Sequence, residues 1–392
     1  PGMFAEVPGA SYLIASSSES GTASDPKSVR TDIGISVNQD FATAGPSYTL
    51  KAAAAKSGML LGTALKLNYF TSDAGYMGVV STECNLLTPE TELKDNYCWT
   101  GPTTYDFTGA DDFIARAAAL GMPVRGHVLM YPDHPPAWVN SSTVTSANWQ
   151  SLIDGWMAAM CPRYPNLVGV DVINEMFLIS SSAPFAGGYK DSDWIQAAGS
   201  GDALMDFCFR TARKYTPSNI PLFYCDNGTE RGSDSAQDAQ RNNIVAAITR
   251  LKAAGVPIDG FNSQWHLVLD RSYQYRHDRH KHRDFLKALV NLGLIINITE
   301  IDIRASLTEG WGKSNGEFDR RCAELLAATL ETYFEVVPAS QRQHISFWQM
   351  SDKYQVWGNM PVTGQAQRPL PLDTSYARKE MYIAALNTLL GV

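Results

Sequence analysis

The chain has 392 residues, of which 44% are hydrophobic and 18% are charged, and this is the composition of an ordinary globular protein. Its formal net charge of -8 argues against a nucleic-acid partner. No apolar run approaches the roughly 20 residues that a membrane span requires, so we expect no membrane segment.

The first 45 residues differ from the rest of the chain. They are rich in Ser, Thr, Gly and Ala and contain no motif. We predict an N-terminal extension over residues 1–45, either packed on the main domain or a mobile tail, and one main domain over residues 46–392. No charged segment followed by an apolar one opens the numbering, which starts at Pro1. The sequence leaves open whether a signal peptide was removed before this point. We expect a secreted protein.

The six cysteines do not decide the cellular compartment. Cys84 and Cys98 flank a turn-rich segment and form one candidate disulfide, while Cys208 and Cys225 form a second. We expect the first pair to be bonded if the protein is secreted. No C-x-x-C motif is present in the sequence, which disfavours a zinc or redox site.

Apolar strand-like runs alternate with helix-like periods along the main domain. The predicted strands are Leu60–Leu65, Val79–Leu86, Pro123–Leu129, Val168–Asn174, Leu222–Asp226, Gly260–Gln264, Leu294–Glu300 and His344–Gln349. The predicted helices are Tyr48–Lys56, Ala110–Leu120, Asn148–Met160, Trp194–Tyr215, Ser235–Ala254, Arg283–Leu292, Glu317–Val336 and Ser375–Leu390. Such alternation predicts a parallel sheet, and eight strands predict a closed (β/α)₈ TIM barrel in a single domain.

Two of these strands carry a glutamate at or near their end. The run Ile295–Ile303 reads I-I-N-I-T-E-I-D-I, which is typical of a strand buried on both faces, and Glu300 lies near its end. The run Val168–Phe177 has the same character and ends with Glu175. A buried carboxylate costs free energy unless it is paired, so such groups are retained mostly where chemistry needs them. Either glutamate alone could be an ion-pair partner, but the two together suggest the facing carboxyl groups of a glycoside hydrolase.

Polar side chains follow most of the other predicted strands as well. In a (β/α)₈ barrel the carboxyl ends of the strands carry the active site, so these groups should meet at one mouth. They are Glu83, Asn85, His127, Asn174, Asp226, Asn227, Gln264, His266, Asp302, Trp348 and Asp352.

The stretch Arg271–Arg283 is strongly basic and contains a His-x-His pattern. Its spacing matches no common metal site, and its only acidic neighbours are Asp278 and Asp284. A solvated basic loop over the cleft is the better interpretation, and contact with an acidic sugar decoration is an alternative.

Seven segments resemble, in the same order, motifs of glycoside hydrolase family 10, the retaining endo-β-1,4-xylanases. The resemblance runs from about Lys51 to Leu390. The matching segments are G-T-A at Gly62–Ala64, L-T-P-E-T-E-L-K at Leu87–Lys94, V-R-G-H at Val124–His127 with P-A-W-V at Pro136–Val139, D-V-I-N-E at Asp171–Glu175, S-Q-W-H-L at Ser263–Leu267, I-T-E-I-D-I at Ile298–Ile303 and F-W-Q-M-S-D-K-Y at Phe347–Tyr354.

The resemblance implies a role for each matching residue. Glu175 would be the general acid/base and Glu300 the nucleophile. Asn174 would hold the sugar 2-OH, His266 would orient Glu300, and Asp302 would support His266. The residues that the resemblance places against the glycone sugars are Glu90, Lys94, His127, Gln264, Trp348 and Trp357.

The chain also departs from the family pattern around the sugar-binding residues. The departures are Thr91, Tyr131-Pro132, Val170 and Cys225, together with one extra residue between Asp352 and Trp357. Pro132 stands where the family has an imidazole that hydrogen-bonds the −1 sugar, and proline has no side-chain donor. We therefore expect weak activity on plain linear xylan and better activity on a substrate that uses the reshaped subsite.

The leading functional hypothesis is a retaining glycoside hydrolase that cleaves β-1,4-xylosidic bonds in xylan or a related plant glycan. A second is a β-glycosidase of altered specificity for a decorated oligosaccharide or a plant glycoside. A hypothesis of another class is a carbohydrate-binding barrel without turnover, which the retained glutamates argue against. The expected partner is a polysaccharide or oligosaccharide, the expected state is a monomer, and no cofactor or metal is implied.

Overall fold

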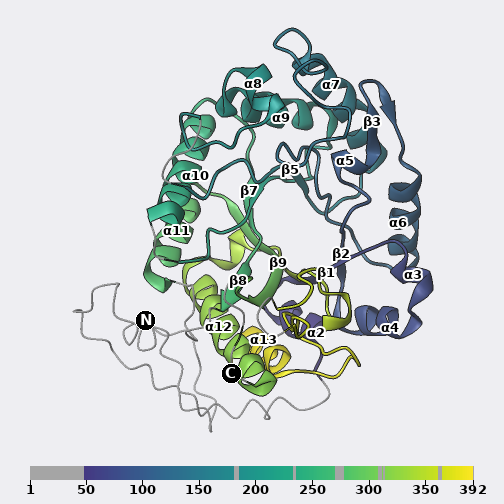
Figure 1. The fold of residues 1–392 in the computed structure, drawn as a ribbon, viewed down its shortest axis with the longest axis vertical. Coiled ribbons are helices and arrows are strands. Elements are labelled where there is room, and N and C mark those ends of the chain that lie inside the picture. The colour runs from purple at the N-terminus through teal and green to yellow at the C-terminus, as the bar shows by residue number, and fades with distance from the viewer. Residues whose placement is uncertain are drawn as a thin grey trace.

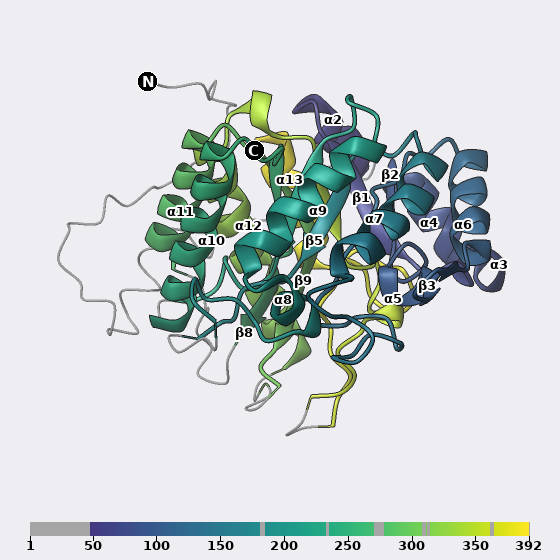
Figure 2. The same ribbon diagram turned by 90° about the horizontal axis from the view of Figure 1, so that it is seen from above.

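A computed structural model describes residues 48–180, 185–232, 235–269, 278–307, 311, 314–360 and 364–391. The predicted extension over residues 1–45 lies outside these ranges. Among the described residues a ring of parallel strands is surrounded by helices (Figure 1). The view from above shows α10, α11 and α12 side by side on one side of the strands (Figure 2).

The strands form the predicted closed barrel. Their bounds are β1 (Leu60–Leu65), β2 (Leu86–Pro89), β5 (Val170–Asn174), β6 (Leu222–Asp226), β7 (Gly260–Ser263), β8 (His266–Leu269), β9 (Ile295–Ala305) and β10 (His344–Phe347), with β3 (Trp99–Gly101) and β4 (Thr104–Tyr105) as a separate antiparallel pair. Hydrogen bonding follows the order β2-β1-β10-β9-β7-β6-β5, and β8 adds to β9. Residues 124–130 close the ring through parallel bridges from Leu87 to Val124, Gly126 to Val170 and Met130 to Ile173.

Helices follow most strands and cover the outside of the barrel. They are α2 (Leu50–Lys56), α3 (Tyr69–Ser72), α4 (Ala74–Glu83), α5 (Asp95–Cys98), α6 (Thr108–Ala119), α7 (Trp149–Met160), α8 (Asp193–Ala198), α9 (Gly201–Tyr215), α10 (Ser235–Ala253), α11 (Arg279–Asn291), α12 (Asn315–Val336) and α13 (Glu380–Leu390), with 3₁₀ turns at Cys161–Arg163, Ala339–Gln341 and Asp352–Tyr354. The predicted helix Trp194–Tyr215 is two helices, because Gly199 ends α8 at φ 80° and Ser200 caps α9. No helix among the described residues is long and apolar enough to cross a bilayer.

The prediction of the second strand was wrong. Residues 79–83 belong to α4, and β2 begins only at Leu86. The β-branched pair Val79 and Val80 suggested a strand. The side chains that are buried, however, are Tyr76, Val80 and Glu83, which is a helical spacing, and Asp73 caps this helix by accepting from the Tyr76 N–H at 2.8 Å.

This correction moves two predicted site residues to the other end of the barrel. The Glu83 carboxylate accepts from the backbone N–H of Leu50 at 2.9 Å and from the Tyr382 hydroxyl at 2.8 Å. The Asn85 side chain accepts from the N–H of Leu61, at the start of β1, at 2.8 Å. Glu83 therefore joins α4 to α2 and α13, and Asn85 holds the start of β1, both at the amino ends of the strands. Figure 1 shows α13 beside α2 there.

The predicted disulfide between Cys84 and Cys98 was also wrong. Both thiols are free and buried, as are Cys208 and Cys225. Cys84 precedes β2, whereas Cys98 follows it in α5 and donates from Sγ to the Glu92 carbonyl oxygen at 3.0 Å. A strand of this length separates its two ends by about 13 Å, and a disulfide needs Cα atoms within about 7 Å.

The basic stretch is helical in its second half. Residues 271–277 lie outside the described ranges, but Arg279–Arg283 form the first turns of α11 rather than a loop. Asp278 caps this helix by accepting from the N–H groups of His280 and Lys281. His282 is buried against the Trp265 ring, with ring centroids 5.4 Å apart. The stretch therefore supports the fold where it is described.

The barrel strands approach closely at Gly260, the first residue of β7. A Cβ added there would lie 2.4 Å from the Ile295 carbonyl oxygen of β9 and 2.4 Å from the Phe223 ring of β6. Because the backbone of β9 cannot yield, the contact fixes glycine at this position.

We predict that Gly260→Ala lowers the free energy of unfolding by about 1–3 kcal/mol, as overpacking of a core does. The measurement is urea denaturation followed by circular dichroism. Gly316→Ala is the matched control, because a Cβ at Gly316 in α12 meets nothing within 4 Å. Equal midpoints for Gly260→Ala and the wild type would contradict the prediction.

Candidate active site

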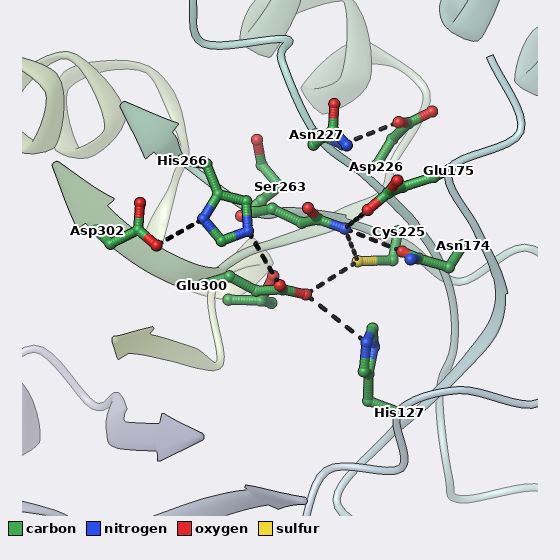
Figure 3. Close-up of polar contacts among 12 residues, drawn as sticks. His127, Asn174, Glu175, Cys225, Asp226, Asn227, Ser263, His266, Glu300 and Asp302 are labelled. Atoms are coloured by element: carbon green, nitrogen blue, oxygen red, sulfur yellow. Dashed lines mark hydrogen bonds and ion pairs between the residues drawn. The ribbon is translucent and has the colours of Figure 1, made fainter. Parts of the chain in front are cut away.

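The two strand-end glutamates lie at the same end of the barrel. Glu175 follows β5, and Glu300 lies within the long strand β9. Their side chains are 13% and 5% exposed. Figure 3 shows them within one cluster of polar side chains, with Glu175 next to Asp226 and Glu300 between His266 and His127. The separation of the two carboxyl groups stays a prediction of about 5–5.5 Å, the spacing of a retaining pair.

The backbone at these strand ends adopts conformations that side chains other than glycine rarely take. The φ angles are 54° at Glu175, 63° at Trp265 and 84° at Gln349. The Glu175 N–H is held by the Cys225 carbonyl oxygen of β6 at 2.9 Å. Such left-handed residues cost free energy and concentrate at functional sites, where the surrounding structure fixes them.

Glu300 is held by an imidazole on one side. His266 Nε2 lies 3.3 Å from Glu300 Oε2, and His266 Nδ1 lies 2.9 Å from Asp302 Oδ2. Burial acts to lower the pKa of His266, but the two carboxylates outweigh it and raise the pKa to about 10. The imidazole is therefore a cation at neutral pH. The predicted chain Glu300–His266–Asp302 is present as a set of contacts (Figure 3).

A guanidinium lies on the other side of Glu300. Arg125 Nη2 is 3.5 Å from Glu300 Oε1 and pairs with Asp171, whose side chain is fully buried. His127 Nδ1 is 2.7 Å from Asp171, and His127 Nε2 is 3.9 Å from Glu300. Burial acts to raise the pKa of Glu300, but the His266 hydrogen bond and the neighbouring positive charges lower it to about 2. Glu300 is therefore held ionised.

Arg125 and Asp171 are site residues that the sequence analysis missed. Both stand inside quoted motifs, V-R-G-H and D-V-I-N-E, but received no role. The spacing held a usable signal, because residues 125 and 127 lie two apart in a strand-like segment and so share a face with His127.

Cys225 also faces Glu300. Its Sγ lies 3.9 Å from Glu300 Oε1 and 3.7 Å from Gln264 Nε2. Cys225, His127 and Asp171 offer ligand atoms within 4.8 Å of one another. Arg125 Nη2 already lies 3.1 Å from His127 Nδ1, 2.5 Å from Asp171 Oδ2 and 3.7 Å from Cys225 Sγ, so a guanidinium rather than a metal ion occupies this cluster.

Glu175 has different surroundings. Gln264 Nε2 donates to Glu175 Oε1 at 2.9 Å and to Asn174 Oδ1 at 3.0 Å. Lys190 Nζ lies 3.5 Å from Glu175 Oε2. Burial acts to raise the pKa of Glu175, but the Lys190 charge and hydrogen bonds from Gln264 and Tyr131 outweigh it, and the pKa lies below its ordinary value. A general acid needs a raised pKa, so the surroundings of Glu175 in the free protein act against the role that the family resemblance implies.

The predicted glycone residues lie around these two glutamates. Lys94 Nζ is 5.6 Å from the centre of the Trp348 ring and 5.8 Å from that of Tyr131. Trp348 packs edge-on against His127 and His266. Trp357 donates from Nε1 to Asp302 Oδ2 at 2.8 Å, and Glu90 pairs with Lys66 at 3.1 Å and accepts from Gln349.

Two other strand-end carboxylates have buried polar partners. Asp352 pairs with Lys379 at 2.9 Å and accepts from the Leu370 N–H at 3.0 Å, so it ties the end of the barrel to the segment before α13. Asp226 is fully buried, accepts from the Tyr224 hydroxyl and from the Asn227 N–H, and lies next to Glu175 in Figure 3. Burial raises the pKa of Asp226 to about 7.

Residues 49–388 match the sequence profile described as Glycosyl hydrolase family 10. The chain belongs to this family. An endo-1,4-beta-xylanase 2 from Aureobasidium pullulans is 26% identical over 91% of the chain and 94% of its own length. Endo-1,4-beta-xylanase A from Cellvibrio japonicus is 30% identical over 72% of the chain and 47% of its own length.

Solved structures of this family share the barrel. Native xylanase 10B from Thermotoga maritima aligns with a TM-score of 0.74 at 27% identity and covers 87% of the chain and 98% of its own. Xylanase 10B from Thermotoga petrophila RKU-1, solved in complex with xylobiose, aligns with a TM-score of 0.75 at 25% identity and covers 88% and 98%. The predicted family and barrel are therefore confirmed.

The ion pairs of His266 with Asp302 and Glu300 predict that the stability of the protein depends on pH. Its pKa is about 10 in the folded protein and about 6.5 in an unfolded chain. The stability that this pair contributes is therefore fully present below about pH 6.5 and is lost as the pH rises towards 10. The free energy of unfolding of the wild type should exceed that of His266→Gln most at pH 6 and least at pH 10. The measurement is urea denaturation at pH 6, 8 and 10. A difference in free energy of unfolding between the two proteins that stays constant over this range would argue against a charged His266.

Proposed function

We propose that the protein hydrolyses β-1,4-xylosidic bonds with retention of anomeric configuration. The observation that carries this proposal is the contrast between two buried carboxyl groups at one barrel end. Glu300 lies between the cations Arg125 and His266, whereas Glu175 is held by Gln264 and Lys190. Membership of Glycosyl hydrolase family 10 and the similarity to proteins named endo-1,4-beta-xylanases support the substrate class.

In the first step Glu300 is the nucleophile. An oxygen of its carboxylate forms a bond to the anomeric carbon, and the bond from that carbon to the leaving-group oxygen breaks. Glu175 gives its proton to this oxygen. His266 and Arg125 fix the direction of the Glu300 carboxylate and keep it ionised before attack, so no proton has to be removed from the nucleophile.

In the second step Glu175 acts as a base. It takes a proton from water, the water oxygen bonds to the anomeric carbon, and the ester bond to Glu300 breaks. While Glu300 is esterified it carries no negative charge, so Glu175 loses a repulsive neighbour and its ionised form is favoured further. The change of charge on one glutamate thus prepares the other for the second half of the reaction.

The remaining residues hold the sugar. Asn174, which accepts a hydrogen bond from Gln264, binds the 2-OH of the sugar. Lys94 and Trp348 form the −1 subsite, Glu90 the −2 subsite, and Trp357 closes the −1 site through its bond to Asp302. We infer that the protein is secreted, because a polymeric substrate cannot reach an enzyme inside a cell. A monomer is the proposed state.

One observation favours a changed substrate preference within this reaction class. Tyr131 and the buried Pro132 follow the third barrel segment, and the Tyr131 N–H is engaged by Asp95 at 2.9 Å. The neighbouring Asp133 is held by Lys190 at 2.8 Å. This loop supplies no free backbone donor at Tyr131 or Pro132, which supports a preference for a branched or otherwise decorated glycan over plain xylan. A panel of linear and branched xylo-oligosaccharides and other β-glycosides tests the preference.

We expect Glu300→Gln to lower kcat on xylo-oligosaccharides at least about a thousandfold, because an amide has nearly the shape of the carboxylate but is a poor nucleophile. Product chromatography gives the rates, and the thermal midpoint checks the fold. The wild type should release shorter xylo-oligosaccharides under the same conditions. Binding without any hydrolysis by the wild type would instead support a carbohydrate-binding barrel.

We expect Glu175→Ala to separate substrates by their leaving groups. Its kcat/KM should fall by about 10²–10⁴-fold on unactivated xylo-oligosaccharides, whose leaving oxygen needs a proton. The loss should be small on a dinitrophenyl glycoside, whose leaving group departs without one. Asp226→Asn, which changes the neighbouring carboxyl group, should show no such separation. Equal losses of Glu175→Ala on both substrates would remove Glu175 from the acid/base role.

A further inference from the structure

Lys190 is the cation that lies against the acid/base glutamate. Its Nζ is 3.5 Å from Glu175 Oε2 and 2.8 Å from Asp133 Oδ2. The side chain is only 16% exposed, so solvent screens the interaction with Glu175 little. Neither the family motifs nor the spacing along the chain assigned a role to this lysine.

The backbone holds Lys190 in register with Glu175. The chain folds back after β5, so that Phe177 and Tyr189 form an antiparallel bridge. The Lys190 N–H donates to the Met176 carbonyl oxygen, next to Glu175, at 2.8 Å, and the Leu178 N–H donates to Gly188 at 2.9 Å. The lysine is therefore attached to the same strand extension as the glutamate, and the contact does not depend on a free surface side chain.

We propose, on the basis of the function proposed above, that Lys190 is a positioning residue for the acid/base. It holds the Glu175 carboxylate by charge and thereby sets the pH range in which Glu175 carries the proton that it donates. The same charge stabilises the ionised Glu175 that the second step needs as a base.

Lys190 acts against the carboxyl groups that face Glu175 and acts in the same direction as its hydrogen-bond donors. Glu300 from β9 carries a like charge, and Asp226 at the end of β6 is a buried carboxyl group. Gln264, after β7, and Tyr131 add hydrogen bonds. Among the groups that face Glu175 in the described part of the chain, Lys190 is the full positive charge within 4 Å of its carboxylate. Its removal leaves burial and Glu300 opposed by the hydrogen bonds of Gln264 and Tyr131 alone.

The sign of the effect follows from these charges. Without Lys190 the ionised form of Glu175 loses its nearest cation, so the pKa of Glu175 rises and the proton is kept to higher pH. The alkaline limb of kcat/KM on unactivated xylo-oligosaccharides, which reports the protonated acid in the free enzyme, should move to higher pH by the same amount. A residue that only supports the loop would change stability without moving this limb.

The test is a carbon-13 NMR titration of the full chain with labelled glutamate carboxyl groups, assigned with Glu175→Gln. We expect Lys190→Met to raise the pKa of Glu175 by at least about one unit, the effect of an opposite charge at this distance. Lys190→Arg should keep the wild-type value. Lys214→Met is the matched control, because Lys214 pairs with Asp154 at 2.9 Å between α9 and α7, among other partners.

Asp133→Asn separates charge from loop support. It breaks the ion pair of Lys190 with the loop but leaves the lysine beside Glu175, so it should not raise the pKa of Glu175. The proposal is overturned if Lys190→Met leaves the pKa unchanged, or if Asp133→Asn raises it equally. Should Lys190→Met fail to fold, Lys190→Gln removes the charge from a polar chain and carries the same expectation.

The titration needs no turnover, so it decides the role of Lys190 by itself. A wild type that hydrolyses no xylo-oligosaccharide would overturn the proposed function while the titration still gives its result. A wild type that is active, with an unmoved alkaline limb in Lys190→Met, would overturn the proposal for Lys190 alone.

Discussion

The free energy of keeping Glu300 ionised inside the barrel governs the arrangement of this site. A buried carboxylate is costly unless charges and hydrogen bonds compensate it. Here Arg125 and His266 supply the positive charge from two different sides. Each of these cations is itself buried and needs a carboxylate of its own. Asp171 pairs with Arg125, and Asp302 pairs with His266. The polar groups at the mouth thus form linked pairs that extend outward from Glu300.

The same reasoning explains why the two glutamates differ. Glu300 lies in the middle of a long strand, and its charged neighbours come from other barrel segments: His266 from β8, and Arg125 from the segment 124–130 that pairs with β2 and β5. Glu175 stands just beyond β5 in a left-handed conformation, and its cation comes from a chain segment that folds back on β5. The position of Glu300 is therefore set by the barrel itself, whereas that of Glu175 depends on a loop connection. Substrate preference and pH range can change through such loops without altering the barrel.

Much of the barrel could be predicted because its strands are buried on both faces. The run at β9 is almost wholly apolar and β-branched, and it places Glu300 without ambiguity. The error at β2 has a local cause, since Val79 and Val80 favour a strand while Asp73 and the helical spacing of buried residues decide for α4. The predicted position of Glu83 depended on the boundary between α4 and β2. With the strand starting at Leu86 rather than Val79, Glu83 lies at the amino end of the barrel and not at the mouth.

The site itself was predicted less completely than the barrel. Motif positions gave Glu175, Glu300, His266 and Asp302, and the two-residue spacing from His127 could have given Arg125. Lys190 left no comparable signal, since its contact with Glu175 requires the chain to fold back through a segment without a regular pattern. The direction in which the pKa of Glu175 is shifted depends on this contact and on the hydrogen bond from Tyr131. It could not be inferred from a strand-end carboxylate alone.

The central claim is that Glu300 and Glu175 act together in a retaining double displacement. Proton NMR of the first product formed from a xylo-oligosaccharide tests it most directly, because the anomeric signals resolve before mutarotation mixes them. We expect the β-anomer to appear first and the α-anomer only later. An α-anomer as the initial product would contradict it, since that outcome requires direct attack by water and leaves Glu300 without a covalent role.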